Sequence, residues 1–595
     1  DRRARWLALV SQRFSRSRLA LAGVGGLTAL VVGNVVRSDY GWIVALATTG
    51  AFAVLARRHE KVEQARVRLA RWRLIQARHL ARLQLDWDVL PPPSGPPPPG
   101  HPFAADLDLA GPRSVLHLID ATASEGGSAC LRDWVLALIP DPEAVRQRQA
   151  RVRALVQERR FRDRLGLLGL EAAGRQVRWS DGPVRAWIGG DPADRAVRRW
   201  ATGLSALAAT TVLLVGLDLA GGPALWSYSF FLYLALYGSR YRAFAAVFDR
   251  AYDLQRAIAE VEPVLAFLEA SPLGHREPLA PVWAPFRGPD RPSVHYTHLG
   301  RIAAAAAVSR SDVGRIVLNG LLPYDLLLTL ALGRLRERLR AVAPAWLAAY
   351  TEIEALASLA ADADLHAGSV SFPDLVAPSD GAPLVEAEAL GHPLLPSAVR
   401  NSVTLDVGGV LVLTGSNMAG KSTFLRALGV AAALGWAGGP VAAGRLRLTP
   451  LRPFASMRVG DVLQEGLSTF YAEVRRLRLL LDAVETAGAP PVLVLIDEMY
   501  RGTNNRERLA GARAFVRALS GAPATSLVAT HDLALADLAG EIPEVRNAHF
   551  REVVDGDALR FDYRLRPRPC PTTNALVIME RAGLPVEAPR MERAS

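Results

Sequence analysis

The N-terminal part of the chain contains two long apolar runs. Residues 19–36 include one strongly polar side chain, Asn34, and a short connection at 37–39 leads into a second mainly apolar run at 40–56. At about 1.5 Å per residue, each run as a helix spans on the order of 25 Å, close to the hydrocarbon thickness of a bilayer. Basic residues flank the pair at both ends: Arg2, Arg3, Arg13, Arg16 and Arg18 before it, and Arg57, Arg58 and Lys61 after it. The pattern predicts a transmembrane hairpin with both ends in the cytoplasm.

A second apolar pair covers residues 201–219 and 220–238, joined around Gly221-Gly222-Pro223. Arginines again lie outside both ends, so we expect the same orientation. The alternatives are a signal peptide for the first pair and a buried helical hairpin for either pair. A second apolar run directly after the first is not typical of a signal peptide. The soluble alternative is stronger for the second pair, where Asp218 would be costly in the middle of a bilayer.

Other stretches of the N-terminal half have patterns typical of helices. Residues 57–90 are basic and favour helix, which indicates a juxtamembrane helix, and the proline-rich stretch 91–99 predicts a stiff polyproline linker. Apolar positions recur every three or four residues at 113–136, which predicts a packed helix. Further helices are expected at 143–164, after Asp141-Pro142, and along two amphipathic stretches at 324–342 and 345–359.

After Phe372 the pattern changes to shorter runs typical of strands. Three short runs are wholly or mainly apolar, as in the central strands of a parallel sheet: 410–413, 492–496 and 526–530. Each run is followed directly by glycine, carboxylate or histidine residues. Open α/β sheets bind their ligands at the carboxyl ends of the strands, so these residues are candidates for a site.

Composition and charge narrow the function classes. A chain of 595 residues, half of them apolar, can build several domains. Its two cysteines, Cys130 and Cys570, exclude a disulfide framework and a cysteine-rich zinc site. The formal net charge is +12, mostly from arginine, which suits either a phosphate backbone or anionic lipid headgroups.

A phosphate-binding loop follows the strand pattern at 410–413 and fits G-x-x-x-x-G-K-[ST]. Its residues are Gly415, Ser416, Asn417, Met418, Ala419, Gly420, Lys421, Ser422 and Thr423. Backbone N–H groups of such a loop, at the positive end of a helix, bind phosphate oxygens. Lys421 can reach the β- and γ-phosphates, and the Ser422 hydroxyl can ligate Mg²⁺. The motif predicts an ATP site; a glycine-rich surface turn that matches by chance is the alternative.

Two further strand ends supply candidate catalytic groups. Asp497 is placed to hold Mg²⁺, and Glu498 to polarise the water that attacks the γ-phosphate. His531, after the next buried strand, could sense the γ-phosphate. Adjacent carboxylates that merely start a helix, and a histidine with a structural role, are the alternatives.

Four motifs in this order resemble the nucleotide motifs of MutS-type ATPases. They are the loop 415–423, the segment 465–473, the segment 497–504 and Thr530-His531-Asp532. The resemblance covers 103–165 and about 325 to the C-terminus. It implies a dimer with composite sites, in which the segment with Ser468 and Thr469 reaches the partner's γ-phosphate and the segment 501–505 crosses the dimer interface. Ala582-Gly583-Leu584-Pro585 would help pair the ATPases. His392 and Pro393 lie near where the family holds the base.

The chain also departs from the mismatch-reading members of that family. Those proteins carry an N-terminal domain with a Phe-x-Glu wedge, and here an apolar hairpin occupies that place. The Phe-x-Glu matches at 267–269 and 550–552 are misplaced for this task. A membrane-anchored MutS-like ATPase is therefore the better description, and direct mismatch recognition is not expected.

Together these observations predict a fold class and a domain organisation. We expect an α/β P-loop ATPase domain with a mainly parallel sheet, MutS- or ABC-like, C-terminal to a mostly α-helical core and lever region with two transmembrane hairpins. The expected domains are an N-terminal hairpin (1–60), a basic helix and linker (61–102), a helical core and lever interrupted by a second hairpin at about 200–238 (103–371), and the ATPase domain with a C-terminal helical dimerisation element (372–595).

The expected function is ATP hydrolysis, with Mg²⁺ as cofactor, in a homodimer that moves membrane-anchored helical arms. Membrane lipid is an expected partner, and the resemblance implies double-stranded DNA as another. The expected location is the cytoplasmic (inner) membrane, with the ATPase domain in the cytoplasm. Two alternatives stay open: an ABC-like transport ATPase, and a nucleotide-switched membrane scaffold that binds no DNA.

Overall fold

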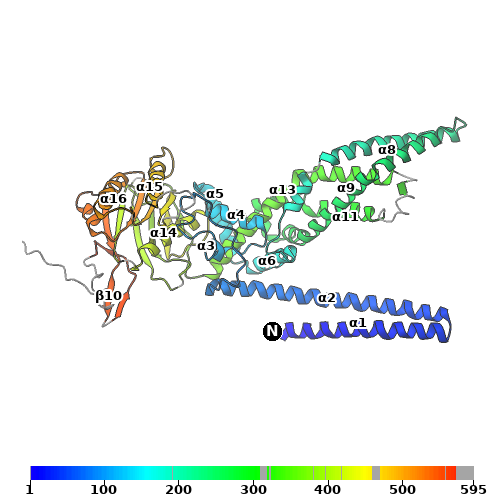
Figure 1. Cartoon of the computed structure of the whole chain (residues 1–595), viewed down its shortest axis with the longest axis horizontal. Helices are drawn as coiled ribbons and strands as arrows, with labels where there is room; N and C mark the ends of the chain where they lie inside the picture. The colour runs from blue at the N-terminus through cyan, green and yellow to red at the C-terminus, as the bar shows by residue number, and fades with distance from the viewer. Residues whose placement is uncertain are drawn as a thin grey trace, which may run out of the picture.

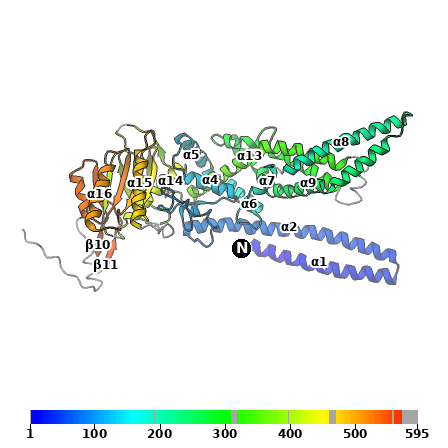
Figure 2. The ribbon, with the colours of Figure 1, turned by 45° about the horizontal axis from the view of Figure 1, so that its top comes forward.

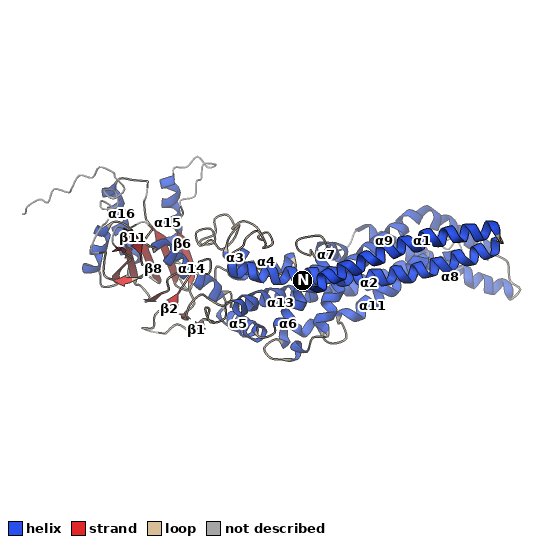
Figure 3. Ribbon diagram, turned by 90° about the horizontal axis from the view of Figure 1, so that it is seen from below, coloured by secondary structure: helices blue, strands red, loops and turns tan. Residues whose placement is uncertain are grey.

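The protein is elongated, with helices at one end and an α/β domain at the other (Figure 1). The computed structural model describes residues 2–189, 192–308, 318–319, 323–379, 381–395, 397–416, 418–458, 469–500, 502–555 and 558–570. Strands lie at one end only, and the long helices extend away from them (Figure 3). The chain is therefore helix-rich with α/β sheets in its C-terminal part, as the sequence predicts.

The first hairpin consists of α1 (Arg2–Val35) and α2 (Ser38–Gln84), which run antiparallel. Small residues let the two helices approach closely: a Cβ added to Gly41 would lie 2.6 Å from the Cα atom of Gly33. The basic segment expected as a separate juxtamembrane helix is a direct continuation of α2, since residues 57–84 contain no helix-breaking residue. The hairpin extends beside the helical part of the molecule (Figure 2) and contacts it through α6 (Arg159–Ala173).

The second hairpin consists of α8 (Pro192–Leu219) and α9 (Trp226–Glu269). The sequence placed the start of its second helix at 220. The structure has a turn at 220–225 instead, because Gly221 has a φ of 89° and Pro223 follows it. The turns of both hairpins lie at the same end of the molecule, far from the α/β domain (Figure 1).

Three helices in the described part of the chain are long and apolar enough to cross a membrane. They are α1, α2 and the segment Ala196–Leu219 of α8. In their most apolar windows only 0%, 6% and 17% of the residues are buried. These helices therefore present apolar side chains to their surroundings instead of to a protein core.

Shorter helices and one long lever form the middle of the molecule. They are α3 (Val115–Ile119), α4 (Glu125–Val135), α5 (Pro142–Val156), α6, α7 (Gly182–Gly189), α10 (Ala280–Trp283), α11 (Pro292–Val308) and α13 (Tyr324–Leu365), with 3₁₀ turns η1 (Pro272–His275) and η2 (Ala284–Phe286).

Three helix predictions need correction. The single helix expected at 113–136 is α3 and α4, because the Ser124 hydroxyl accepts a hydrogen bond from the Gly127 N–H and starts a new helix. The helix expected at 143–164 is split into α5 and α6, and the two expected at 324–359 are one helix that contains Pro344.

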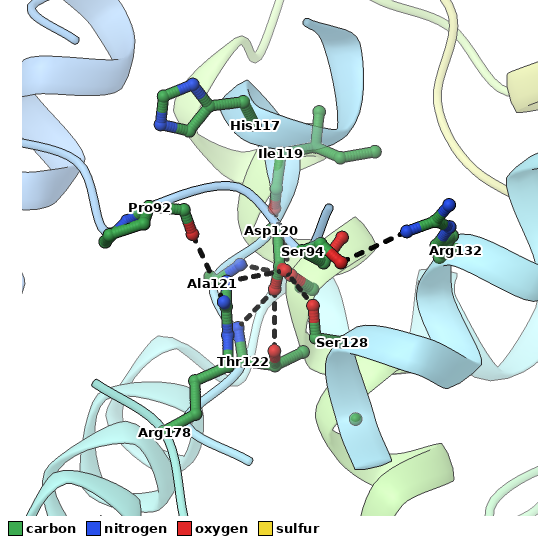
Figure 4. A network of polar contacts seen from close by, with 12 residues as sticks. Pro92, Ser94, His117, Ile119, Asp120, Ala121, Thr122, Ser128, Arg132 and Arg178 are labelled. Atoms are coloured by element: carbon green, nitrogen blue, oxygen red, sulfur yellow. Dashed lines mark hydrogen bonds and ion pairs between the residues drawn. The ribbon is translucent and has the colours of Figure 1, made fainter. Parts of the chain in front are cut away.

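A polar network joins the proline-rich stretch to this helical core (Figure 4). Arg178 donates to the carbonyl of Pro92 (3.2 Å) and to Asp120 (2.9 Å). Arg132 donates to the carbonyls of Ser94 (3.1 Å) and Pro96 (2.6 Å). Because proline has no N–H, a proline-rich stretch forms few backbone hydrogen bonds within itself. Here two arginines satisfy three of its carbonyls. The stretch is thus held along the core.

The α/β domain contains a six-stranded sheet in the order β12-β9-β4-β8-β7-β6, parallel except for β12. The strands are β4 (Val410–Thr414), β6 (Arg452–Ser456), β7 (Val492–Asp497), β8 (Ala524–Ala529), β9 (Val545–His549) and β12 (Arg566–Pro567). Alternate side chains face opposite ways: Leu411 and Leu413 belong to a core shared with α14 (Lys421–Trp436), whereas Val410 and Val412 pack with α15 (Thr469–Glu485) and α16 (Asn505–Leu519). Both faces are therefore covered, as the continuous apolar runs predict.

Two smaller sheets and a 3₁₀ segment complete the domain. A four-stranded sheet has the order β1-β5-β2-β3, and β10 pairs with β11. The bounds are β1 (Asp374–Leu375), β2 (Val385–Leu390), β3 (Asn401–Leu405), β5 (Arg445–Leu448), β10 (Glu552–Asp555), β11 (Ala558–Phe561) and η4 (Leu533–Gly540).

Candidate nucleotide-binding site

The glycine-rich loop connects β4 to α14, in the strand, loop and helix order that the motif requires. Gly415 has a φ of 137°, and a Cβ there would lie 2.4 Å from the carbonyl oxygen of Phe550. Only glycine fits this position, both by conformation and by space. Lys421 is 4% exposed, and its ammonium donates to the carbonyls of Gly415 (2.6 Å) and Ser416 (2.8 Å). The loop thus curls around the lysine that would bind phosphate.

Ser422 and Asp497 come together from different elements. The hydroxyl of Ser422, at the start of α14, donates to Oδ2 of Asp497, at the end of β7, over 2.5 Å. Mg²⁺ prefers oxygen ligands and takes several of them from phosphate and water, so one hydroxyl and one carboxylate are a fitting protein contribution. Within the described residues, no group of three or more His, Cys, Asp or Glu side chains forms a denser metal site.

Glu498 and His531 face each other across the ends of neighbouring strands. Nδ1 of His531 lies 3.0 Å from Oε1 of Glu498. The backbone after β7 is strained: Glu498 and Tyr500 have φ values of 60° and 58°, which side chains with a Cβ rarely adopt. The N–H of Glu498 donates to the carbonyl of Ala529 (3.0 Å), and the N–H of Tyr500 donates to the Glu473 carboxylate (2.5 Å). These bonds fix the direction of the Glu498 side chain.

Glu473 is the last residue of the motif at 465–473, and in the structure its carboxylate supports the turn that contains Glu498. It lies in α15 and is 7% exposed. Burial, together with the charge of Glu473, raises the pKa of Tyr500 above its ordinary value. The spacing of 27 residues between Glu473 and Tyr500 carries no local pattern that could have indicated this contact.

A cavity of about 690 Å³ opens beside the loop. Its lining includes Lys421, Ser422, Asp497 and Glu498, together with His392, Asn401, Phe550 and Tyr563. The cavity therefore combines charged groups with aromatic ones, a lining that suits a ligand with both a triphosphate and a flat base.

The cavity is also lined by His392, which the resemblance places near the base, and by Asn401 and Tyr563, which the sequence did not single out. Burial, with a smaller contribution from Arg426, lowers the pKa of His392 to about 4, so the imidazole is neutral at pH 7. Asn401 donates to the carbonyl of Tyr563 (2.9 Å) and accepts from the N–H of Leu565 (2.8 Å). Asn401 thereby holds Tyr563 at the cavity although 162 residues separate them in the chain. Pro393 is not among the lining residues.

Some of the sequence-derived assignments lie outside the described residues. They are Ser468, Asn417, Arg501 and the C-terminal element at 582–585. The remaining loop residues are in the described part, with Ala419 buried and Met418 exposed.

The arrangement of sheet, loop and side chains is typical of P-loop nucleotide-binding domains. Lys421, Ser422, Asp497, Glu498 and His531 come from β4, β7 and β8 or the residues just after them, and β8 lies between the other two strands. Carboxyl ends of parallel strands meet at one edge, so three segments distant in sequence converge there.

Comparison with known proteins agrees with this class. Residues 411–594 match the family described as MutS domain V. The chain is 33% identical over 259 residues to "DNA mismatch repair protein MutS" of Natronomonas pharaonis, covering 42% of this chain and 28% of that protein. It is 35% identical over 266 residues to "DNA mismatch repair protein MutS 2" of Halobacterium salinarum (43% and 29%) and 38% identical over 198 residues to "Endonuclease MutS2" of Thermus thermophilus (33% and 26%).

Residues 411–594 of the chain are therefore similar to MutS domain V. The matched part spans less than a third of the length of each of these relatives.

Proposed function

We propose that this protein binds and hydrolyses Mg-ATP in a homodimer and uses the cycle to move helical arms that are anchored in a membrane. The observation that carries the ATPase part is the convergence of Lys421, Ser422, Asp497, Glu498 and His531 beside a cavity of about 690 Å³. A surface turn that matched the loop motif by chance would not bring these groups together.

Each side chain has a task that follows from its position. The loop N–H groups and Lys421 bind the phosphates, which replace the carbonyls that the ammonium now contacts. Ser422 and Asp497 would hold Mg²⁺, which neutralises charge on the phosphate oxygens when it is bound. Glu498 orients the attacking water and accepts its proton, and His531 holds the carboxylate in place through Nδ1.

Membrane anchoring rests on the two hairpins. Leu19, Leu27 and Leu46 in the first hairpin are 76%, 65% and 77% exposed, and Val212 and Leu213 in α8 are 71% and 76% exposed. Apolar surface of this extent is costly in water and favourable in hydrocarbon. Both turns lie at the end of the molecule opposite the ATPase domain (Figure 1), so both hairpins can enter one bilayer from the same side.

Polar contacts at the base of the first hairpin suit a membrane surface. Arg18 donates to Nδ1 of His59 (3.2 Å), and Nε2 of the same ring lies 3.1 Å from the Ser11 hydroxyl. Arginine at this level can reach anionic headgroups. We place the protein in the cytoplasmic membrane with the ATPase domain in the cytoplasm.

Double-stranded DNA is the ligand we propose for the moving arms, since two of the relatives carry DNA mismatch repair in their names. Binding through arginine-to-phosphate contacts should weaken steeply as salt rises, because counterions are released. Binding of duplex DNA that is independent of salt, or absent at low salt, would remove DNA from the proposal and leave the ATPase intact.

ATP turnover by the full chain in lipid nanodiscs tests the central claim. Lys421→Ala should lose nucleotide binding, whereas Glu498→Gln should keep binding and lose about 100-fold or more in kcat, the range for a catalytic base. Glu485→Gln, a surface carboxylate at the end of α15, is the matched control and should behave as wild type. Normal hydrolysis by Lys421→Ala would overturn the site. Equal and negligible rates for wild type and Glu498→Gln, with binding intact, would favour the scaffold alternative, and ATP-driven solute movement in sealed vesicles would favour transport.

A further inference from the structure

A short segment between the proline-rich stretch and the helical core is docked on the ATPase domain. We call residues 103–109 the strap. Phe103 and Leu107 are 1% and 0% exposed, and Ala104 and Leu109 are also buried in the main core. The strap contains neither helix nor strand, so its position depends on its contacts with the ATPase domain and on the N–H groups of Val115 and Leu116, which donate to the carbonyls of Asp108 and Leu109.

Asp106 makes the central contact. Its side chain is buried, and Oδ1 accepts hydrogen bonds from the backbone N–H groups of Met457 (2.9 Å) and Arg458 (2.7 Å), just after β6. Its other oxygen accepts from the Arg476 guanidinium (2.6 Å), which lies in α15. A buried carboxylate with three donors is held strongly, because charge-assisted bonds are stronger where water is excluded. The strap thereby ties β6 to α15.

The link through α15 leads to the catalytic glutamate. Arg476 lies one helical turn after Glu473, which accepts the hydrogen bond from the Tyr500 N–H. That bond fixes the strained turn containing Glu498. If Arg476 moves with the strap, Glu473 on the same helix moves too, and with it the turn that positions Glu498.

A second link leads to the phosphate loop. Nε of Arg426, one turn after Ser422 in α14, donates to the backbone carbonyl of Asp106 (3.1 Å). Leu107 packs against the same helix: a Cβ added to Gly429 would lie 2.5 Å from Leu107 and 2.8 Å from Leu495 of β7. The Leu107 side chain thus packs against the helix that carries Lys421 and beside the strand that carries Asp497.

The opposite end of the strap is attached to the membrane hairpin. The preceding stretch is pinned by Arg132 and Arg178. Before it, Arg82 near the end of α2 is 4% exposed and donates to the carbonyls of Leu118 (2.9 Å) and Asp120 (2.7 Å). The chain from α2 to the strap is therefore held in place along its length, and a rigid segment transmits displacement where a flexible linker would not.

We propose that the strap couples the nucleotide site to the membrane hairpin, with Asp106 as its positioning residue. This inference rests on the proposed ATPase function. Asp106 does not touch the nucleotide cavity, so its effect is on catalysis and on arm movement more than on affinity. Closure of the site around ATP shifts α14 and α15, and the strap carries that shift to α2.

Asp106→Asn tests the coupling, since it keeps the side-chain shape but removes the charge and one acceptor oxygen. We expect kcat to fall about tenfold with nucleotide Kd within about twofold, a size typical of coupling residues. The ATP-dependent change in distance between spin labels at Leu83 of α2 and Arg506 of α16, in a chain with both cysteines replaced, should disappear. Asp482→Asn, which breaks a surface ion pair with Arg478 on the same helix α15, is the control. It should keep the wild-type kcat and the ATP-dependent distance change.

A second variant keeps the test decisive if Asp106→Asn does not fold. Arg458→Gln removes the surface ion pair with Asp108 (2.7 Å) and leaves the buried carboxylate in place. It should lower kcat about threefold and reduce the distance change. Wild-type kcat and a wild-type distance change in Arg458→Gln, and in Asp106→Asn if that variant folds, would overturn the coupling function alone. A wild-type protein that neither binds nor hydrolyses ATP would instead overturn the proposed function.

Discussion

The imidazole of His531 and the carboxylate of Glu498 are joined by a 3.0 Å contact between Nδ1 and Oε1. The two residues follow β8 and β7, which are neighbours in the six-stranded sheet. A carboxylate can only accept, so Nδ1 carries the proton and the histidine orients Glu498 from the side. This pairing, and the strained backbone of Glu498, hold the proposed base in one direction before any ligand binds.

Removal of the imidazole should therefore slow hydrolysis more than it weakens binding. For His531→Ala we expect kcat to fall by about 10- to 100-fold, with nucleotide affinity within about threefold. Steady-state turnover and fluorescent-nucleotide binding on the full chain separate the two effects. His275→Ala, an exposed histidine in η1, serves as control. A large loss of affinity with an unchanged kcat would show that His531 binds nucleotide and does not orient Glu498.

The glycine at the start of the phosphate loop should tolerate no side chain. In Gly415→Ala the new Cβ would lie 2.4 Å from the Phe550 carbonyl, at a φ of 137°, so the loop must shift and nucleotide binding should be lost. Gly488→Ala is the matched control, because Gly488 also has a positive φ (72°) but has nothing within 4 Å of its Cβ position. The control should lose about 1–2 kcal/mol of stability and bind nucleotide normally. Equal nucleotide affinity in both variants would contradict the loop geometry.

The first hairpin should expose its turn on the side of the membrane opposite the ATPase domain. With Cys130 and Cys570 replaced by serine, a single cysteine at Ser38, in the first turn of α2, should react with a membrane-impermeant maleimide added to intact cells. A cysteine at Lys61, beyond the apolar span of the same helix, should react only after permeabilisation. Labelling of both positions in intact cells, or of neither, would contradict the topology, and recovery of the chain in the soluble fraction would contradict anchoring.

The buried carboxyl of Glu354 should make the helical core sensitive to pH. Burial raises the pKa of Glu354 to about 7, although Ser124, Tyr350 and the Ala123 N–H all donate to it. The folded state thus binds this proton more tightly than the unfolded state, whose pKa is near the ordinary 4.5. Its stabilising effect is complete below about pH 4.5 and is lost as the pH rises through about 7.

The measurement compares thermal unfolding of the detergent-solubilised chain at pH 5 and pH 8. Glu354→Gln has no titrating carboxyl at this position. Relative to it, the free energy of unfolding of the wild type should fall by ~1–3 kcal/mol from pH 5 to pH 8. Glu352→Gln, on the same helix, removes a partly exposed ion pair with Arg151 and should leave the pH dependence unchanged. A pH response in Glu354→Gln equal to that of the wild type would assign the dependence to other groups.

Local pattern was sufficient for the elements of the ATPase core. The runs at 410–413, 492–496 and 526–530 lie in strands β4, β7 and β8, as is typical of short continuous apolar runs, which suit a sheet buried on both faces. Helix boundaries were less reliable: a cap at Ser124 divides one expected helix, and Pro344 does not separate the two helices expected at 324–342 and 345–359. Capping depends on a single side chain, and packing around α13 outweighs the hydrogen bond lost at proline.

The site was predicted in part. Lys421 and Ser422 could be predicted as site residues because the loop motif is contiguous in the sequence. Asp497, Glu498 and His531 could be predicted because they follow the ends of predicted strands. Glu473, Asn401 and Tyr563 were not singled out, since their positions depend on contacts with residues distant in the chain.

The sequence by itself determined which residues could meet phosphate and which stretches could meet lipid, since both follow from local chemistry: a glycine-rich turn before a helix, and runs of apolar residues long enough to span a bilayer. Only the tertiary structure decided that the first hairpin packs beside α6 and that Asp106 of the strap lies against β6, α14 and α15. Those relations depend on which distant segments pack together, and the free energy of that packing is shared among many contacts that no local pattern encodes.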